Sequence, residues 1–374
     1  MLHRSAVQDN PSSGSTLRRP GAGVGLPSVS VILPIRNEER HIEACLERLL
    51  TQDYPSERLE VLVVDGRSDD GTLEVVRLVQ ARHPEFDLRL LDNPERTVPP
   101  GLNAAIRAST GEVIIRMDGH TVPAADYVSA CVAALRASGA ANVGGVIEPV
   151  GTTPFGRAVA LASAHRLGAG DAKYRVGGKP GYVDTGPFGA FRREVFERVG
   201  LFDESLVRNQ DYELNVRIRA SGERVYLDPA IRSAYTPRDG VPALWGQYFQ
   251  YGWWKVETLR RHPRSLRWRQ LVPPAFVVGL AILALAAPWS APAAVAAALG
   301  AAAYLAVVVV TSWGLARELR QVARVALAFT VIHVAFGAGF ITNLVSGGRF
   351  PYRAGRPRVP AFSTSVPGAV EVAP

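Results

Sequence analysis

The stretch EVIIRMDGH, residues 112–120, decides how this chain can fold. Its first part is apolar and predicts a buried strand, and Asp118 follows at the tip of that strand. In an open α/β sheet, ligands bind at the carboxyl ends of the strands. Asp118 is therefore a candidate for contact with a ligand, together with His120 two residues later.

Two earlier apolar segments also end in acidic residues. The segment 29–35 leads into Glu38, and the segment 60–65 ends in Asp65 itself. For Asp65, at the end of a buried strand, we favour a functional role over that of a loop solubiliser. For residues 69–70 a helix cap remains an equal alternative, because acidic groups are favoured at a helix N-terminus.

Strands and helices alternate through this part of the chain. Apolar residues at helical spacing predict a helix from Ile42 to Leu50, and a second helix at 71–82 separates the strand 60–65 from a strand at 87–91. Such alternation predicts a parallel sheet with right-handed crossovers. The elements expected further along are a helix at 99–108, a helix at 121–137, a strand at 143–150, a mobile Gly-rich loop at 168–181, and short helices that end near 200 and 220.

The chain loses almost all charge over long runs after residue 271 and therefore divides into a soluble part and a membrane part. Of three apolar runs, the one at 293–313 is long enough to cross a hydrocarbon core of about 30 Å. The run at 272–289 is shorter, and the run at 325–345 contains His333 and several glycines, so either can be interfacial or re-entrant. We interpret His333 as a polar residue that faces the helix bundle.

Basic residues give a topology signal. With a cytoplasmic soluble domain, three crossings would place the arginines of 317–324 inside and those of 349–358 outside. Positive residues favour the cytoplasmic side, so we predict two full crossings and a cytoplasmic C-terminus. The predicted division of the chain is a disordered tail at 1–27, an α/β domain at 28–241, an aromatic and basic interfacial helix at 242–270, a membrane segment at 271–346 and a disordered tail at 347–374. For the aromatic helix, ordinary packing on the sheet is the alternative.

The charge distribution and the cysteine content indicate which partners and which compartment to expect. The net charge of +8 and the pI of about 9.8 come largely from basic residues at 255–269 and near the C-terminus, which flank apolar runs. This pattern is typical of topology signals and contacts with anionic lipids, and no nucleic-acid partner is expected. Cys45 and Cys131 fall on predicted helices and are typical of small core residues in a reducing compartment.

The three acidic strand ends, with the motifs FGAFRR at 188–193 and NQDYE at 209–213, resemble family 2 glycosyltransferases of the GT-A fold over about 28–262. The run from His165 to Arg175 is similar to the succinoglycan-type glucosyltransferase subgroup. The resemblance implies a nucleotide-diphospho-sugar transferase fold, a mostly parallel central sheet with flanking helices, followed here by C-terminal transmembrane helices.

The resemblance also implies roles for single residues. Asp211 corresponds to the catalytic base of an inverting displacement, although a helix N-terminal acid worth only ~0.3 to 1 kcal/mol is the plain alternative. Asp118 corresponds to the first acid of the family's Asp-x-Asp element and, with His120, to the ligands of a divalent cation. The residues implied in donor binding are Pro34, Arg36, Glu38, Asp65, Arg67 and Asp118, and those on the acceptor side are Arg192, Arg193, Gln210, Gln247 and Trp253.

His120 departs from the family pattern, because it replaces the second acid of Asp-x-Asp. Mg²⁺ and Mn²⁺ take one or two protein ligands and complete their shell with phosphate and water, and an imidazole suits Mn²⁺ better than Mg²⁺. The Gln-x-x-Arg-Trp motif of processive synthases has no match at 247–254, which favours addition of a single sugar.

The sequence thus predicts a membrane-anchored, inverting, metal-dependent glycosyltransferase. It would move one sugar, from a UDP-hexose donor, to a lipid-linked or growing glycan in polysaccharide biosynthesis, at the cytoplasmic side of the inner (plasma) membrane. The alternatives are a processive polysaccharide synthase and a non-catalytic nucleotide-sugar-binding scaffold. A sugar-nucleotide pyrophosphorylase or a dinucleotide enzyme is disfavoured, because the glycines at 21–25 precede the first strand and cannot form a phosphate-binding turn after it.

Overall fold

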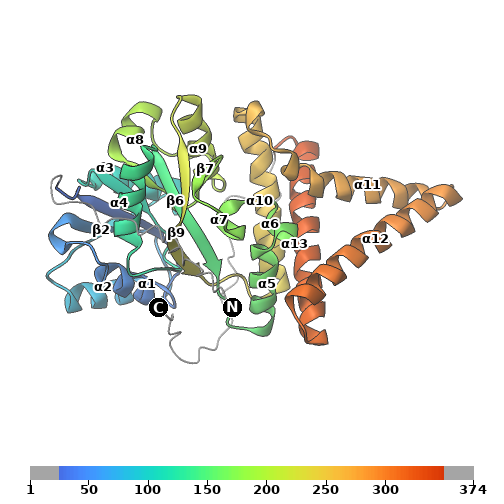
Figure 1. The fold of residues 1–374 in the computed structure, drawn as a ribbon, viewed down its shortest axis with the longest axis horizontal. Helices are drawn as coiled ribbons and strands as arrows, with labels where there is room; N and C mark the ends of the chain where they lie inside the picture. The colour runs from blue at the N-terminus through green and yellow to red at the C-terminus, as the bar shows by residue number, and fades with distance from the viewer. Residues whose placement is uncertain (1–24, 349–374) are drawn as a thin grey trace, which may run out of the picture.

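The computed structural model describes residues 25–348, so the predicted tails lie almost entirely outside the described residues. The described part forms a nine-stranded sheet in the order β3-β2-β1-β4-β8-β6-β9-β5, with β7 paired to β9 (Figure 1). The strands are β1 (Val29–Ile35), β2 (Leu59–Asp65), β3 (Asp87–Asp92), β4 (Val113–Arg116), β5 (Thr121–Pro123), β6 (Asn142–Pro149), β7 (Gly181–Val183), β8 (Ala190–Arg192) and β9 (Val225–Tyr235).

The first four strands in chain order are parallel, as predicted. Val29 of β1 lies opposite Leu59 of β2 and Val113 of β4, so the carboxyl ends of these strands meet at one edge. Asp65 is opposite Ile35 at that edge, and Asp118 follows just beyond β4. The sheet therefore gathers the acidic strand ends that the sequence singles out.

Helices cover both faces of the sheet (Figure 1). On one face, α1, α2 and α4 pack on side chains such as Val31 and Leu33. On the other face, α3, α8 and α9 pack on Ile32 and Leu62. The helices are α1 (Ile42–Leu50), α2 (Thr72–Arg82), α3 (Val98–Ala108), α4 (Tyr127–Ser138), α8 (Arg193–Val199) and α9 (Gln210–Ala220), with a short 3₁₀ turn, η1 (Ser56–Arg58).

The second half of the sheet is mixed, and two local predictions are wrong there. The segment expected as a helix at 121–137 begins with β5, which pairs antiparallel with β9, and becomes helical only at Tyr127. The expected loop at 168–181 contains α6 (Arg166–Ala169), α7 (Lys173–Val176) and the start of β7. Left-handed glycines at Gly170 and Gly177 end these two short helices, so the glycines separate structured turns.

The C-terminal helices form two groups (Figure 1). α10 (Val241–Arg261) and α13 (Leu319–Ser346) lie side by side, with α5 (Pro154–Ala164) against α13, whereas α11 (Val272–Ala286) and α12 (Ala291–Leu315) project away as a hairpin. Two 3₁₀ turns, η2 (Pro263–Ser265) and η3 (Trp268–Gln270), join α10 to α11.

Glycines set the close contact between α10 and α13. A Cβ added at Gly252 would lie 2.0 Å from the carbonyl oxygen of Phe336, and one added at Gly339 would lie 2.0 Å from that of Phe249. Small residues at such positions allow two helix backbones to approach closely. The predicted aromatic helix therefore packs on α13, and its position at the membrane surface remains a prediction.

Candidate active site

Arg116, the last residue of β4, joins two acidic side chains at the carboxyl edge of the sheet. Its Nη2 atom is 2.6 Å from Oδ1 of Asp118, and its Nη1 atom is 3.4 Å from Oδ2 of Asp211. The guanidinium is buried and lies over the ring of Phe188, at 4.8 Å from its centroid. Two acids far apart in the sequence therefore share one buried cation.

Asp211 lies in the first turn of α9, in an environment that suits a proton acceptor. Its Oδ1 atom is buried and, among residues 25–348, has no hydrogen-bond partner. Burial raises the pKa of this carboxyl group; Arg116 opposes the rise, Asp118 adds to it, and the net pKa lies above the ordinary value. A carboxylate with a raised pKa accepts a proton more readily than an ordinary surface aspartate does.

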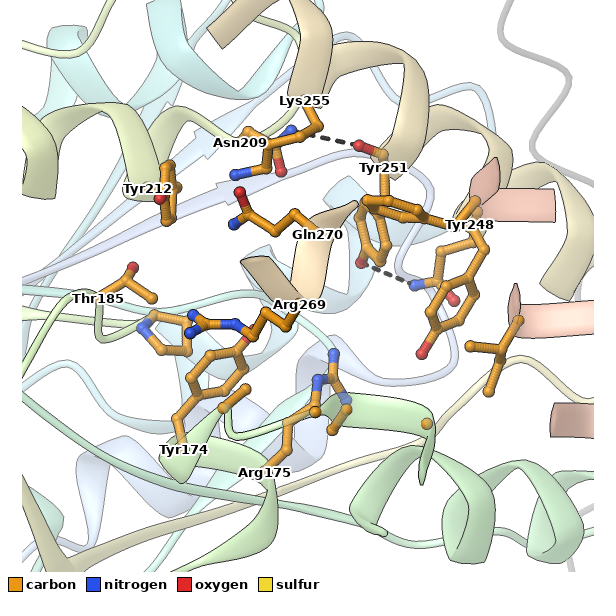
Figure 2. Close-up of a pocket in the computed structure, with 18 of the residues that line it drawn as sticks. Tyr174, Arg175, Thr185, Asn209, Tyr212, Tyr248, Tyr251, Lys255, Arg269 and Gln270 are labelled. Carbon is orange, nitrogen blue, oxygen red and sulfur yellow. Dashed lines mark hydrogen bonds between the residues drawn. The ribbon is translucent and has the colours of Figure 1, made fainter. Parts of the chain in front are cut away.

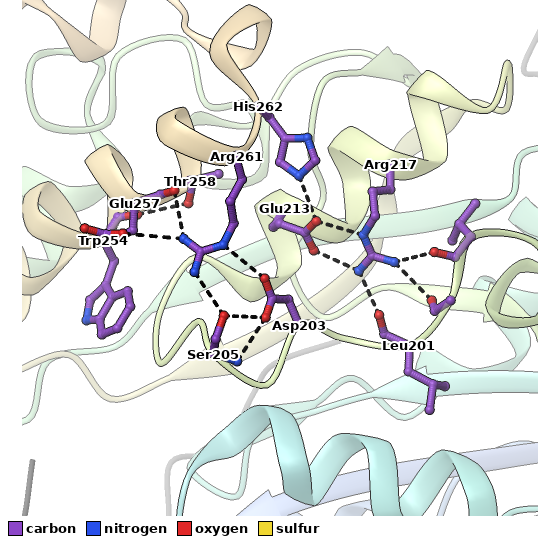
Figure 3. Close-up of polar contacts among 12 residues, drawn as sticks. Leu201, Asp203, Ser205, Glu213, Arg217, Trp254, Glu257, Thr258, Arg261 and His262 are labelled. Atoms are coloured by element: carbon purple, nitrogen blue, oxygen red, sulfur yellow. Dashed lines mark hydrogen bonds and ion pairs between the residues drawn. The ribbon is translucent and has the colours of Figure 1, made fainter. Parts of the chain in front are cut away.

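A network of ion pairs holds α9 in place (Figure 3). Glu213 is 3% exposed in its side chain and accepts hydrogen bonds from Arg217, at 2.7 and 2.8 Å, and from His262 at the end of α10, at 2.9 Å. Asp203 pairs with Arg261 at 3.2 Å. The helix that carries Asp211 is thereby fixed to α10 and, through it, to the C-terminal helices.

His120 contacts a second acidic side chain. Its Nδ1 atom is 2.9 Å from Oε1 of Glu38, which follows β1. A metal-binding histidine commonly donates its other ring proton to a carboxylate, which orients the imidazole. The Glu38 contact therefore leaves Nε2 of His120 as the nitrogen for a ligand.

These residues fit a divalent cation bound with few protein ligands. No group of three or more His, Cys, Asp or Glu that could hold a metal ion occurs within the described range 25–348. Asp118 and His120 nevertheless line the same cavity, and Oε2 of Glu38 is buried without a partner among those residues. One carboxylate and one imidazole match a Mn²⁺ or Mg²⁺ ion that completes its shell with phosphate oxygens and water.

A cavity of about 640 Å³ connects this edge of the sheet to the C-terminal helices. Its walls include Asp118 and Asp211 at one end and Phe276 of α11, Tyr304 of α12 and Phe336 of α13 at the other. Figure 2 shows aromatic and basic side chains from α7, α9, α10 and η3 around the space between. One continuous cavity thus runs from acidic groups to apolar helices.

The other predicted donor-binding residues lie along the same edge but outside the lining of this cavity. Asp65 is 4% exposed and accepts hydrogen bonds from Ser68, at 2.5 Å from its hydroxyl and 3.1 Å from its backbone N–H. Arg67 has a left-handed backbone, and its guanidinium is 3.5 Å from Asp92. Pro34 and Arg36 lie at the end of β1 and directly after it, beside the end of β2. Their donor contacts remain predictions.

Asp69 and Asp70 have structural partners. Asp69 accepts a hydrogen bond from the amide of Asn37 at 2.6 Å, and Asp70 accepts from the hydroxyl and backbone N–H of Thr72. Asp69 thus joins the segment after β1 to the turn before α2, whereas only Asp70 satisfies a backbone N–H at the start of that helix, whose N-cap residue is Gly71.

The predicted acceptor-side residues separate into two groups. Gln210 and Gln247 line the cavity, and Gln247 donates a hydrogen bond to the hydroxyl of Tyr251 at 3.1 Å. Trp253 is 1% exposed and stacks with Phe249 in α10, outside the lining of the cavity. The predicted acceptor-side position of Trp253 is therefore wrong, because helix packing covers its ring.

Arg192 and Arg193 also lie elsewhere. Arg192 is paired with Val113 at the start of β4, the end opposite Asp118, because β8 runs antiparallel to β4. Arg193 donates to the carbonyl of Gly111 at 2.6 Å and to the hydroxyl of Ser109 at 2.9 Å. The predicted acceptor-side position is wrong for both arginines, which stabilise the far edge of the sheet.

The chain matches known proteins over most of its length. The family model described as Glycosyl transferase family 2 matches residues 30–200. The succinoglycan biosynthesis protein ExoA of Rhizobium meliloti (strain 1021) is 32% identical over 317 residues, which cover 84% of this chain and 94% of that protein. The chain belongs to glycosyltransferase family 2.

Two further proteins similar to this chain are glycosyltransferases by their names. A dolichyl N-acetyl-α-D-glucosaminyl phosphate 3-β-D-2,3-diacetamido-2,3-dideoxy-β-D-glucuronosyltransferase of Methanococcus voltae is 28% identical, with 64% of this chain and 76% of that protein covered. The mannosyltransferase PcManGT from Pyrobaculum calidifontis, solved in complex with GDP-Man and Mn²⁺, superimposes with a TM-score of 0.63 at 25% identity, over 88% of this chain and 92% of that one. The predicted GT-A fold and glycosyltransferase activity are confirmed.

Among the cavity residues of this family 2 enzyme, Arg116 and Arg175 had no individual predicted role, and Lys255 was counted only with the basic residues that flank apolar runs. Arg116 precedes Asp118 by two residues, so an extended chain places both on one face, and this spacing could have identified it. Arg175 and Lys255 lie in short or aromatic helical segments whose position over the sheet depends on tertiary packing. No local pattern distinguishes them from other basic residues.

Proposed function

We propose that this family 2 enzyme transfers one sugar from a nucleotide-sugar donor to an acceptor attached to a lipid, by a single inverting displacement. One observation carries the proposal: a single cavity links Asp118 and Asp211 to residues of the apolar helices α11, α12 and α13. An acceptor carried on a lipid could present its glycan at the acidic end while its chain stays among the apolar side chains. A processive synthase and a non-catalytic scaffold are the alternatives that the experiments must exclude.

The proposed chemistry assigns one task to each end of the site. Asp211 removes the proton of an acceptor hydroxyl while that oxygen forms a bond to the anomeric carbon. The bond from this carbon to the donor's diphosphate breaks on the opposite face, and the nucleoside diphosphate leaves with the electron pair. A Mn²⁺ or Mg²⁺ ion held by Asp118 and His120 would supply Lewis-acid neutralisation of that leaving group. We expect a UDP-sugar donor, and GDP-sugars are the first alternative, because PcManGT was solved with GDP-Man.

A binding screen tests the proposed donor and cation. We expect one nucleotide sugar to raise the melting temperature of the full-length protein in detergent only when Mn²⁺ or Mg²⁺ is present. A ligand at one hundred times its Kd stabilises a protein by ~2.7 kcal/mol, which such a measurement resolves. Stabilisation by no nucleotide sugar, with or without the cation, would contradict the proposed function.

We also propose that α11 and α12 cross the membrane as a hairpin, whereas α13 stays with the catalytic domain. By length and composition alone three helices could cross, namely 268–286, α12 and α13. Half of the apolar window of α13 is buried inside the protein, against 6% in each of the other two. Asn343 of α13 donates to the carbonyl of Trp253 and to Glu257 of α10, at 3.2 and 2.9 Å.

The single histidine of α13 supports the same arrangement. His333 is 2.7 Å from the carbonyl oxygen of Leu167 in α6 and 3.0 Å from the hydroxyl of Tyr304. These contacts agree with the predicted bundle-facing role. Two crossings would also keep the arginines of 349–358, like those of 317–324, on the cytoplasmic side, as the positive-inside tendency favours.

Cysteine labelling tests this topology. Cys45 and Cys131 are buried, so a cysteine placed at Ser346 should dominate the reaction with an impermeant maleimide. We expect Ser346→Cys to be labelled only after the cells are permeabilised. Trp289→Cys, at the exposed turn between α11 and α12, is the matched control and should be labelled on intact cells. Strong labelling of Ser346→Cys on intact cells would mean three crossings.

A further inference from the structure

The middle of the cavity carries an excess of positive charge. The only carboxylates among its lining residues in the described part of the chain are Asp118 and Asp211, which both contact Arg116. A concave surface lined by one sign of charge concentrates ligands of the opposite sign. The basic residues that line it are Arg116, Arg166, Arg175, Arg208, Lys255 and Arg269.

Arg175, unlike Arg116 and Arg269, forms no ion pair with a carboxylate in the described part of the chain, and tyrosines surround it. Its guanidinium donates to the hydroxyl of Tyr235 at 2.7 Å and lies over the rings of Tyr174 and Tyr235, at 5.7 and 5.6 Å from their centroids. Within residues 25–348, no Asp or Glu oxygen lies within 4 Å of it, whereas Arg269 pairs with Asp171 and Asp184. A part-buried guanidinium held by tyrosines rather than by a carboxylate keeps its charge and its other N–H groups for an anionic ligand.

The position of Arg175 separates it from the expected donor site. The proposed cation ligands and the ends of β1 and β2 occupy the edge near Asp118. Arg175 instead faces α10, whose Tyr248 packs in an apolar cluster with Phe329 and Ile332 of α13 (Figure 2). The charge of Arg175 therefore lies where the cavity changes from polar to apolar walls.

We propose that Arg175 binds a phosphoryl group of the acceptor's lipid carrier, with the hydroxyl of Tyr248 as a neighbouring donor. The inference rests on the proposed function, because it concerns the acceptor of that same site. The lipid chain would then extend toward Phe276 and Phe336, which line the apolar end. A planar guanidinium can hold a phosphoryl group through two parallel hydrogen bonds.

The probe is farnesyl monophosphate, measured by microscale thermophoresis on the full-length protein in detergent. Farnesol shares its chain but lacks the phosphoryl group, and inorganic phosphate lacks the chain. We expect Arg175→Gln to weaken binding of farnesyl monophosphate at least about tenfold, the scale of a hydrogen bond to a charged group, and to leave farnesol binding unchanged. Tyr248→Phe removes only a hydroxyl and should weaken the same binding by a smaller factor.

Arg224→Gln is the matched control. Arg224 also lies over a tyrosine ring, that of Tyr182, at 4.2 Å from its centroid, but it does not line the cavity. Its replacement should leave the affinity for farnesyl monophosphate unchanged. Equal loss in Arg224→Gln and Arg175→Gln, or equal affinity of the wild type for farnesol and farnesyl monophosphate, would overturn the proposal.

The affinity for UDP and GDP in Mn²⁺ is measured on the same samples. It shows whether Arg175 contacts the acceptor's phosphoryl group or the donor's diphosphate. We expect Arg175→Gln to retain the nucleotide affinity of the wild type. Loss of nucleotide binding with intact binding of farnesyl monophosphate would assign Arg175 to the donor and overturn the inference. The wild type could also bind farnesyl monophosphate through Arg175 and yet bind no nucleotide. That result would support the phosphoryl subsite at Arg175 and contradict the proposed function.

Discussion

Replacement of Asp211 by asparagine is expected to lower turnover by roughly 10² to 10⁴-fold, the usual scale of general-base catalysis. Asparagine keeps the shape of the side chain but cannot accept the acceptor's proton. The ion pair of Asp211 with Arg116 and the burial of its Oδ1 atom distinguish this carboxyl group from that of a solvated helix-end acid. Release of nucleoside diphosphate, measured with saturating donor and acceptor, gives the rate.

Two controls accompany Asp211→Asn. Donor affinity should stay within about threefold of the wild type, which shows that the site still folds. Asp87→Asn removes an exposed acid at the first residue of β3, outside the lining of the cavity, and should leave turnover nearly unchanged. Turnover within about threefold of the wild type in Asp211→Asn would return this residue to a helix N-terminal acid.

Asp118→Asn is expected to abolish the part of donor binding that depends on the cation. Its carboxylate is the charged ligand proposed to join the cation to the diphosphate, and a neutral amide binds Mn²⁺ or Mg²⁺ far more weakly. His120→Ala should weaken donor binding less, because it removes a neutral ligand. Titration of a fluorescent nucleotide with and without Mn²⁺ measures both effects.

The matched control for Asp118→Asn is Asp126→Asn. Asp126 is exposed at the start of α4 and does not line the cavity, so its replacement should keep the Mn²⁺ dependence of the wild type. If Asp118→Asn binds nucleotide in Mn²⁺ as tightly as the wild type does, the assignment of Asp118 as a cation ligand is wrong.

The parts of the fold that the sequence predicted are those with a strong local pattern. The apolar runs that end in Asp65 and just before Asp118 predicted the parallel half of the sheet, since buried parallel strands are continuous apolar segments. The antiparallel half was harder to predict. β5 and β8 have three residues each, and their pairing with distant strands stabilises them rather than their own sequence.

The site shows the same division. Asp118 and Asp211, which the family resemblance singled out, both contact Arg116, a contact that the sequence did not predict, and their roles remain predictions. Arg193 and Trp253 were misplaced because a motif does not show which end of a strand or which face of a helix a side chain occupies. The direction of β8 and the contact between α10 and α13 decide those positions, and both arise from tertiary packing.

The central claim is that one end of the cavity binds the donor through a cation while Asp211 accepts the proton. Donor affinity in Mn²⁺ and single-turnover rate, measured side by side on Asp118→Asn and Asp211→Asn, test it most directly. The account predicts that Asp118→Asn loses the cation-dependent affinity, and that Asp211→Asn keeps the affinity but loses turnover by at least about 10²-fold. Equal loss of donor affinity in both variants, or wild-type turnover in Asp211→Asn, would contradict it.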